Sequence, residues 1–143
     1  MVNVKSHVTV IDELEWIVRN KRWTILSSGS NSHSQLGWNH HDGDPSSGRV
    51  EFPPSVDTTS TTVQIACGSE HVLALIKGPS SDQVWGWGWN EHGNLGTGNT
   101  SDVPIPAQLL PPLNENGAGR VMNISGMWGG CGTSWICCQY DLD

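Results

Sequence analysis

The sequence predicts an all-β protein that forms two to three blades of a β-propeller. Three observations lead to this fold class. The composition is low in apolar residues, at 36%, and rich in glycine, which suits short strands joined by many turns. Two motifs recur at intervals near sixty residues, a period typical of propeller blades when the content is strand-like. Tryptophan and glycine also alternate through one strand-like segment, and the eight tryptophans can build a core where aliphatic residues are scarce.

The first motif occurs at residues 28–37 and again at residues 87–96, 59 positions later. The residues that match in register are Gly29, Asn31, His33, Leu36 and Gly37, which recur as Gly88, Asn90, His92, Leu95 and Gly96. A match of this order and spacing indicates one structural unit used twice.

The second motif, Cys67-Gly68-Ser69-Glu70-His71-Val72, is answered 64 residues later by the segment 131–136, and residues 6–8 align with 70–72. His7 and His71 then occupy matching places, and Trp135 replaces them in the last copy. A catalytic histidine would not tolerate that exchange. We therefore interpret His71 as a structural residue that hydrogen-bonds to the blade backbone.

Strands are expected at residues 63–66, 72–76 and 84–89, because these segments are rich in β-branched, aliphatic or aromatic residues. Glycine, proline, serine and asparagine mark turns at 78–82 and 90–98. Residues 8–22 could form either a helical stripe or two strands, and the register of the repeat favours strands.

The alternation at residues 84–89 predicts two unlike faces on one strand. Trp85, Trp87 and Trp89 would share one face, while Gly86 and Gly88 share the other. A face of glycines would let a neighbouring sheet approach closely, and the indoles would fill the space on the opposite side. Stacked blades need this asymmetry.

The strings at residues 67–75 and 84–98 resemble a repeat of the regulator of chromosome condensation superfamily. The resemblance implies the C-terminal part of a seven-bladed propeller. It divides the chain into a partial blade (1–22), one repeat (23–80), and a repeat with closing strands (81–143). The residues that would carry the repeat structurally are Gly29, Asn31, Gly37, Gly68, His71, Trp87, Gly88, Asn90, Gly96 and Trp135.

The strings at 86–94 and 129–136 are similar to the C-terminal end of the fungal alpha-tubulin suppressor proteins, and the first also resembles the animal secretion-regulating exchange factor. The former resemblance implies an accessory role in Elongator-dependent tRNA wobble-uridine modification, through binding the small zinc protein of diphthamide synthesis. The alternative is guanine-nucleotide exchange on a small GTPase. A third reading, a piece of a larger ligase or kinase, would require further domains. Trp89, Glu91 and His92 are the candidate partner-binding residues.

We expect a protein that is not an enzyme, because the sequence shows no set of nucleophile, base and orienting acid. No cofactor and no metal are expected. The histidine-rich segment 40–44 is interpreted as a solvated loop, because adjacent histidines rarely reach one ion. Cys131, Cys137 and Cys138 lack Cys-x-x-Cys spacing, so they are expected to be buried apolar residues, the last two on opposite faces of a strand.

The net charge of −7, with seven scattered lysines and arginines, argues against direct binding of nucleic acid, which requires clustered cations. Charged residues interrupt the first twenty positions, so neither a signal peptide nor a membrane span is expected there. These observations predict that the protein is located in the cytoplasm, with the nucleus as a second location.

Overall fold

The structure is a computed structural model that describes residues 6–11, 23–39, 47–58, 63–78, 81–111 and 121–140. These residues contain strands and no helix. The strands are β1 (Ser6–Ile11), β2 (Thr24–Gly29), β3 (Ser47–Arg49), β4 (Val63–Cys67), β5 (His71–Ile76), β6 (Gln83–Gly88), β7 (Val103–Leu110), β8 (Val121–Gly129) and β9 (Ser134–Tyr140).

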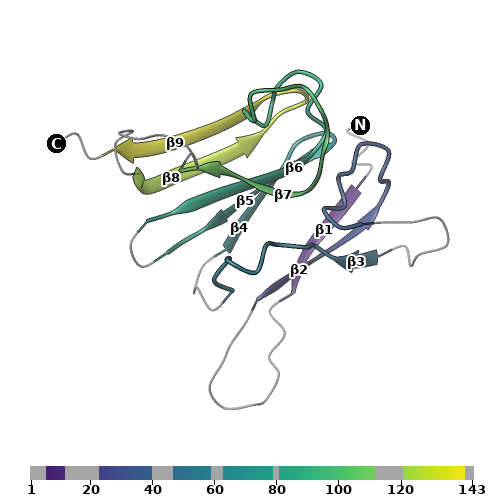
Figure 1. The fold of residues 1–143 in the computed structure, drawn as a ribbon, viewed down its shortest axis with the longest axis horizontal. Helices are drawn as coiled ribbons and strands as arrows, with labels where there is room; N and C mark the ends of the chain where they lie inside the picture. Colours follow the sequence, from purple (N-terminus) through teal and green to yellow (C-terminus); the bar gives the residue numbers. More distant parts are fainter. Residues whose placement is uncertain are drawn as a thin grey trace, which may run out of the picture.

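The strands form three antiparallel sheets, in the orders β1-β2-β3, β4-β5-β6-β7 and β8-β9. Figure 1 shows the three sheets stacked in the order of the chain, with the second sheet in the middle. The all-β prediction is confirmed, and the stack is part of a β-propeller. Residues 8–11 lie in β1, as the strand interpretation expected, whereas residues 12–22 lie outside the described part of the chain.

Two apolar clusters hold the stack together. The first lies between the first and second sheets and contains Ile25, Val50, Val56, Val72, Ala74, Ile76, Trp85 and Trp87. The second joins the second and third sheets and contains Leu75, Val84 and Ile124, with Leu109, Leu110, Met127, Ile136 and Cys138 packed against it. Because alternate residues of β5 enter different clusters, the central sheet is buried on both faces.

The sheets are out of phase with the repeats in the sequence. Residues 23–80 contribute β2 and β3 to the first sheet, but β4 and β5 to the second. Residues 81–143 are divided in the same way, between β6 and β7 of the second sheet and the whole third sheet. Each repeat therefore connects two neighbouring sheets covalently.

A local geometry that both copies share explains the first motif. The side-chain oxygen of Asn31 accepts a hydrogen bond from the Leu36 backbone at 3.0 Å, and that of Asn90 accepts one from the Leu95 backbone at 2.9 Å. Asn90 is fully buried, and its amide group also donates to Thr97, Asn99 and Ser101. In each copy the asparagine thus folds the segment that follows β2 or β6 into a compact loop.

The Trp-Gly strand differs from the prediction in two respects. Strand β6 ends at Gly88, so Trp89 leaves the sheet and does not share the buried face of Trp85 and Trp87. The glycines make room mainly within their own sheet: a Cβ at Gly86 would lie 2.7 Å from a methyl group of Leu109. At Gly86 the space expected for a neighbouring sheet is thus taken by Leu109 of β7 and Leu95 of the β6–β7 segment, and at Gly88 it is taken by the backbone of Glu70 and His71.

The strand pairing also corrects the alignment of the second motif. His71 lies opposite Gly88, but Ser6, not His7, lies opposite the corresponding Gly29. The Gly68 N–H donates to the His71 carbonyl at 2.8 Å, and the same bond in the β8–β9 turn joins Gly130 to Thr133. Thr133, not Trp135, therefore takes the place of His71, because turn hydrogen bonds set the register of a hairpin.

His71 is 1% exposed and contacts the next hairpin. Its Nε2 lies 3.1 Å from the Ser134 hydroxyl oxygen, while Nδ1 is buried without a partner. Burial lowers the pKa of His71, and a smaller opposing effect comes from a hydrogen bond with the Thr133 backbone. The side chain is therefore held neutral between the second and third sheets.

Acidification should destabilise the fold through His71. Its pKa is lower in the folded than in the unfolded chain, so the unfolded chain takes up the proton first. The stabilisation is complete above the ordinary histidine pKa of 6.5 and declines as the pH falls below it, by at most about 1.4 kcal/mol per pH unit. Urea unfolding at pH 7.5 and 5.5 measures the loss. His71→Gln should show a smaller loss, while His92→Gln, an exposed control, should keep it; equal losses in all three proteins would contradict the prediction.

Candidate protein-interaction surface

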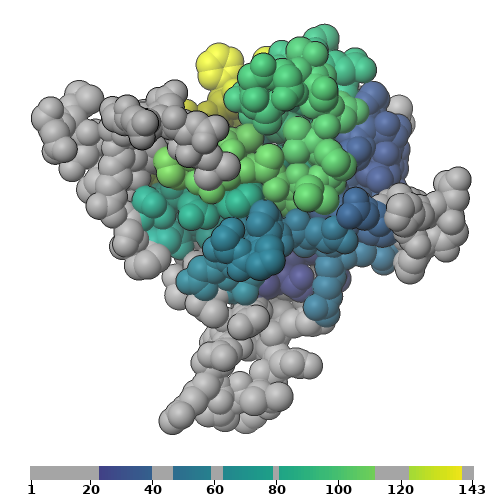
Figure 2. Space-filling model, in the orientation of Figure 1, coloured from purple at the N-terminus to yellow at the C-terminus, as the bar shows by residue number. Residues whose placement is uncertain are grey.

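Four connecting segments meet at one end of the sheets: residues 30–39 after β2, the β4–β5 turn, the β6–β7 segment and the β8–β9 turn. The Trp89 N–H donates to the Glu70 carbonyl at 2.9 Å, and the Ser69 hydroxyl donates to the Cys131 carbonyl at 2.6 Å. Figure 2 shows the green residues of the β6–β7 segment beside the dark blue residues of the first sheet. Segments from all three sheets therefore form one continuous surface.

Trp89 lies at the centre of this surface. Its half-buried ring contacts His33 from the first sheet, with centroids 5.9 Å apart, and His92 from its own loop, with centroids 4.8 Å apart. The indole nitrogen is buried without a hydrogen-bond partner. The Asn94 amide donates to the Trp89 carbonyl at 2.7 Å and so fixes the backbone next to the ring. The result is a preorganised aromatic cluster at the end of β6.

His33 connects the first two sheets through two carboxylates. Its Nδ1 lies 3.1 Å from Asp102 Oδ2, and its Nε2 lies 3.7 Å from Glu70 Oε2. The other oxygen of Asp102 accepts the Asn90 N–H at 3.0 Å, which orients that carboxylate. When His33 is protonated, it forms ion pairs across the boundary between the sheets.

The candidate partner-binding residues lie in this region. Trp89 and His92 are in contact, and Glu91 and His92 are exposed. The turn of the third sheet also approaches, since a Cβ at Gly132 would lie 2.9 Å from the His92 ring. We define the loop-end surface as the set His33, Glu70, Trp89, Glu91, His92 and Asp102.

Sequence reasoning missed three members of the loop-end surface. His33 could have been found, because it matches His92 in the repeat. Glu70 and Asp102 carried no such signal, because each meets His33 only through the packing of the second sheet against the first. The resulting surface combines aromatic rings with three carboxylates, so it suits a partner that presents basic groups.

The structural repeat residues have different surroundings. Asn31, Gly37, Asn90 and Gly96 shape the two matching loops, and Gly29 and Gly88 end β2 and β6. Gly68 lies in the β4–β5 turn and Trp87 in the first apolar cluster. Trp135 is 66% exposed on the outer face of the third sheet, beside its cross-strand partner Trp128.

The prediction that the cysteines are buried is wrong for two of them. Cys131 and Cys137 are exposed, and Cys138 is half-buried. Cys137 and Cys138 do point to opposite faces of β9, and Cys138 packs against the second apolar cluster. Cys137 is exposed because the outer face of β9 is turned away from the second sheet, and Cys131 is exposed in the β8–β9 turn.

In the part of the chain that the structure describes, no three His, Cys, Asp or Glu residues are placed to hold a metal ion. The histidine-rich segment 40–44 lies outside the described residues. No helix among the described residues has the length and apolar character that a membrane span requires.

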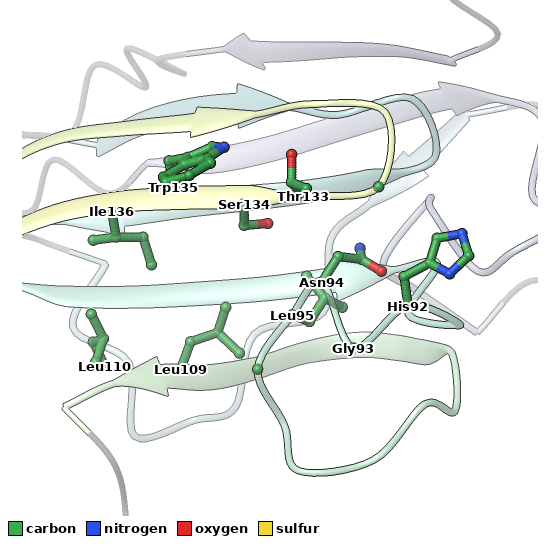
Figure 3. A pocket seen from close by; sticks show the side chains of 12 residues that line it. His92, Gly93, Asn94, Leu95, Leu109, Leu110, Thr133, Ser134, Trp135 and Ile136 are labelled. Atoms are coloured by element: carbon green, nitrogen blue, oxygen red, sulfur yellow. The ribbon is translucent and has the colours of Figure 1, made fainter.

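A pocket of about 480 Å³ opens between β7 and β9, next to the loop-end surface. Figure 3 shows Ile136 on one side and Leu109 and Leu110 on the other, with the loop residues at one end. The complete lining is His92, Gly93, Asn94, Leu95, Gly96, Leu109, Leu110, Gly132, Thr133, Ser134, Trp135 and Ile136.

Comparison with known proteins identifies relatives of the chain. It is 45% identical over 62 residues to the secretion-regulating guanine nucleotide exchange factor of Mus musculus, covering 42% of this chain and 12% of that protein. It is 36% identical over 122 residues to the ultraviolet-B receptor UVR8 of Arabidopsis thaliana, covering 82% and 26%. The crystal structure of human WBSCR16 has a similar fold, with a TM-score of 0.50 and 24% identity over 73% of this chain and 25% of that one.

The chain therefore spans only about an eighth to a quarter of the length of these proteins. The profile of the regulator of chromosome condensation (RCC1) repeat matches residues 24–75 and 81–133, which together exceed half of the chain. Together with the stacked antiparallel sheets and the two matching loops at 30–37 and 89–96, this match shows that the chain belongs to the regulator of chromosome condensation repeat family.

Proposed function

We propose that the protein is a non-enzymatic interaction module that binds another protein through the loop-end surface. One observation carries this proposal: Trp89 is held between two histidines at the point where the connecting segments of the sheets meet. An aromatic side chain with a fixed orientation can bind a partner at low entropic cost, and aromatic anchors dominate interface energies.

The charges around Trp89 indicate which partner surface would fit. Glu70, Glu91 and Asp102 surround the aromatic cluster, and the whole chain carries a net charge of −7. A complementary partner would present lysines or arginines to this surface. Binding should then weaken as the salt concentration rises, because the charges that remain exposed are screened.

For the partner we propose the small zinc protein of diphthamide synthesis, with an accessory role in Elongator-dependent tRNA modification. Support comes from the strings at 86–94 and 129–136, which resemble the alpha-tubulin suppressor proteins and form the β6–β7 and β8–β9 connections of this surface. For a protein in this role we expect a location in the cytoplasm, and in the nucleus as well.

A second candidate is guanine-nucleotide exchange on a small GTPase. It is favoured by the name of the mouse relative, a secretion-regulating guanine nucleotide exchange factor, which is 45% identical over 62 residues. The matched segment is 12% of that relative. Exchange would require this surface to bind a GTPase and to accelerate nucleotide release.

The variant Glu91→Lys tests whether the loop-end surface binds a partner or only stabilises the fold. The immobilised 143-residue chain is tested against the purified zinc protein and against small GTPases loaded with a fluorescent nucleotide. We expect the zinc protein to bind, nucleotide release to stay unchanged, and Glu91→Lys to weaken binding about tenfold, since charge pairs at interfaces contribute substantially to coupling. Glu51→Lys reverses another exposed charge, in the segment that follows β3, and should bind like the unchanged chain.

Faster nucleotide release by the chain, lost in Glu91→Lys, would assign the second candidate instead. Equal binding by both charge-reversed proteins would reject the loop-end surface. Failure of both partners to bind would reject both candidates.

A further inference from the structure

The loop-end surface contains a histidine with a carboxylate at each of its two ring nitrogens. His33 lies between Asp102, directly before β7, and Glu70, in the β4–β5 turn. Its Nδ1 is 3.1 Å from Asp102 Oδ2, and its Nε2 is 3.7 Å from Glu70 Oε2. The three side chains are 23% to 30% exposed, so both solvent protons and a partner protein can reach them.

Neighbouring residues hold this arrangement in place. The His33 backbone N–H donates to the side-chain oxygen of Gln35 at 2.8 Å, and Gln35 is 0% exposed. The second oxygen of Asp102 accepts the Asn90 N–H, which fixes the carboxylate that faces Nδ1. The Trp89 ring lies against the imidazole, with ring centroids 5.9 Å apart. These contacts keep the imidazole between the two carboxylates.

The protonation state of His33 decides how it meets Glu70. A neutral imidazole donates one hydrogen bond, and an ionised carboxylate can only accept. The bond to Asp102 therefore requires the proton on Nδ1, which leaves a lone pair on Nε2 facing Glu70. Nε2 then offers Glu70 no donor, and the negative charge of Glu70 can attract a partner. Protonation of Nε2 supplies that donor and places a positive charge between the carboxylates.

The other histidine of the loop-end surface has different surroundings. His92 contacts the Trp89 ring and lies next to Glu91 in the β6–β7 segment. Within the described part of the chain, the carboxylates in ion-pair reach of a histidine are those of Glu70 and Asp102, and both face His33. His33 is thus the histidine whose charge can act directly on the acidic groups of this surface.

We propose that His33 is a pH switch that controls whether the loop-end surface binds a basic partner. This inference rests on the proposed function, because it takes the partner to present lysines or arginines. Histidine ordinarily gains its charge as the pH falls from about 8 to about 5, whereas carboxylates keep theirs down to about pH 4. Binding is therefore strongest above this range. It weakens as the pH falls, because protonated His33 pairs with Glu70 and repels the partner.

Nuclear magnetic resonance of the free chain tests the switch without a partner. The side-chain carboxyl carbon of Glu70 is followed from pH 8 to pH 5 in the 143-residue chain labelled with carbon-13. We expect its resonance to shift together with that of His33 Cε1, and to stay in place in His33→Gln. Glutamine can donate the same bond to Asp102 but carries no charge. A Glu70 resonance that shifts alike in both proteins, or does not shift at all, would overturn the proposal.

Binding of a basic probe tests the consequence for docking. The probe is a fluorescein-labelled tetrapeptide of arginine, whose anisotropy is measured against the chain at pH 7.5 and 5.5, with circular dichroism to verify folding. We expect about tenfold weaker binding at pH 5.5, and a change below threefold in His33→Gln. His92→Gln removes a histidine that has no such carboxylate contact, so it should keep the tenfold change. Equal changes in all three proteins would show that the general loss of negative charge, and not His33, weakens binding.

Glu70→Gln provides a second variant for the same measurement. It removes the charge that protonated His33 neutralises, so it should bind the probe at pH 7.5 about as weakly as the unchanged chain does at pH 5.5. Its own affinity should differ by less than threefold between the two pH values. Binding like that of the unchanged chain at pH 7.5 would overturn the proposal. Neither experiment contains the zinc protein, so the identity of the partner is tested separately.

Discussion

Gly88→Val is expected to destabilise the protein more than any change on its surface. Gly88 has φ of +97°, a conformation that valine rarely adopts. A Cβ there would lie 2.6 Å from the Glu70 carbonyl oxygen and 2.9 Å from the His71 Cα. Both are backbone atoms, Glu70 in the β4–β5 turn and His71 at the start of β5, so neither can move aside as a flexible side chain would.

The expected loss is about 2–6 kcal/mol, because overpacking and backbone strain each cost about 1–3 kcal/mol. That is a large part of the roughly 5–15 kcal/mol by which natural domains are stable. Urea unfolding followed by circular dichroism measures it. Gly98→Val is the control, since Gly98 also has a positive φ of +81° but no neighbour within 4 Å. Equal losses would mean that strain alone, and not the close approach to the β4–β5 turn, explains Gly88.

Trp87→Ala should cost about 3–5 kcal/mol, the range for truncating a buried aromatic side chain. Trp87 is 0% exposed and contributes both ring contacts and a hydrogen bond to the boundary between the first two sheets. Its removal leaves a cavity against Gly37 and deprives the Gln35 carbonyl of its donor. The same unfolding measurement applies.

Trp128→Ala serves as the control for Trp87→Ala, because it removes the same side chain where 58% is exposed. Exposed substitutions usually change stability by about 0.5 kcal/mol or less. If the two variants unfold at the same urea concentration, Trp87 does not hold the first two sheets together.

The fold class and the repeat could be predicted because their causes are local. The Asn90 side chain reaches the Leu95 backbone five residues away, and Asn31 reaches Leu36 over the same interval. An interaction that closes within one loop leaves its mark as a short motif, which recurs wherever the loop recurs. The 59-residue offset was therefore visible without any tertiary information.

The face of each tryptophan was only partly predictable. Strict alternation correctly grouped Trp85 with Trp87 but wrongly included Trp89, because β6 ends one residue earlier. The second motif was misaligned for a related reason. Residue identity aligned Trp135 with His71, whereas turn hydrogen bonds place Thr133 there.

By itself the sequence determined the strands β4, β5 and β6, the matching loops and the family, all of which depend on residues within a few positions of one another. Tertiary structure alone decided which repeats share a sheet and which residues form the loop-end surface. His33 meets Asp102 across 69 positions, and Trp87 meets the Gln35 carbonyl across 52. Contacts of that span follow from the stacking of sheets, which packs side chains from different strands together and leaves no periodic signal in the chain.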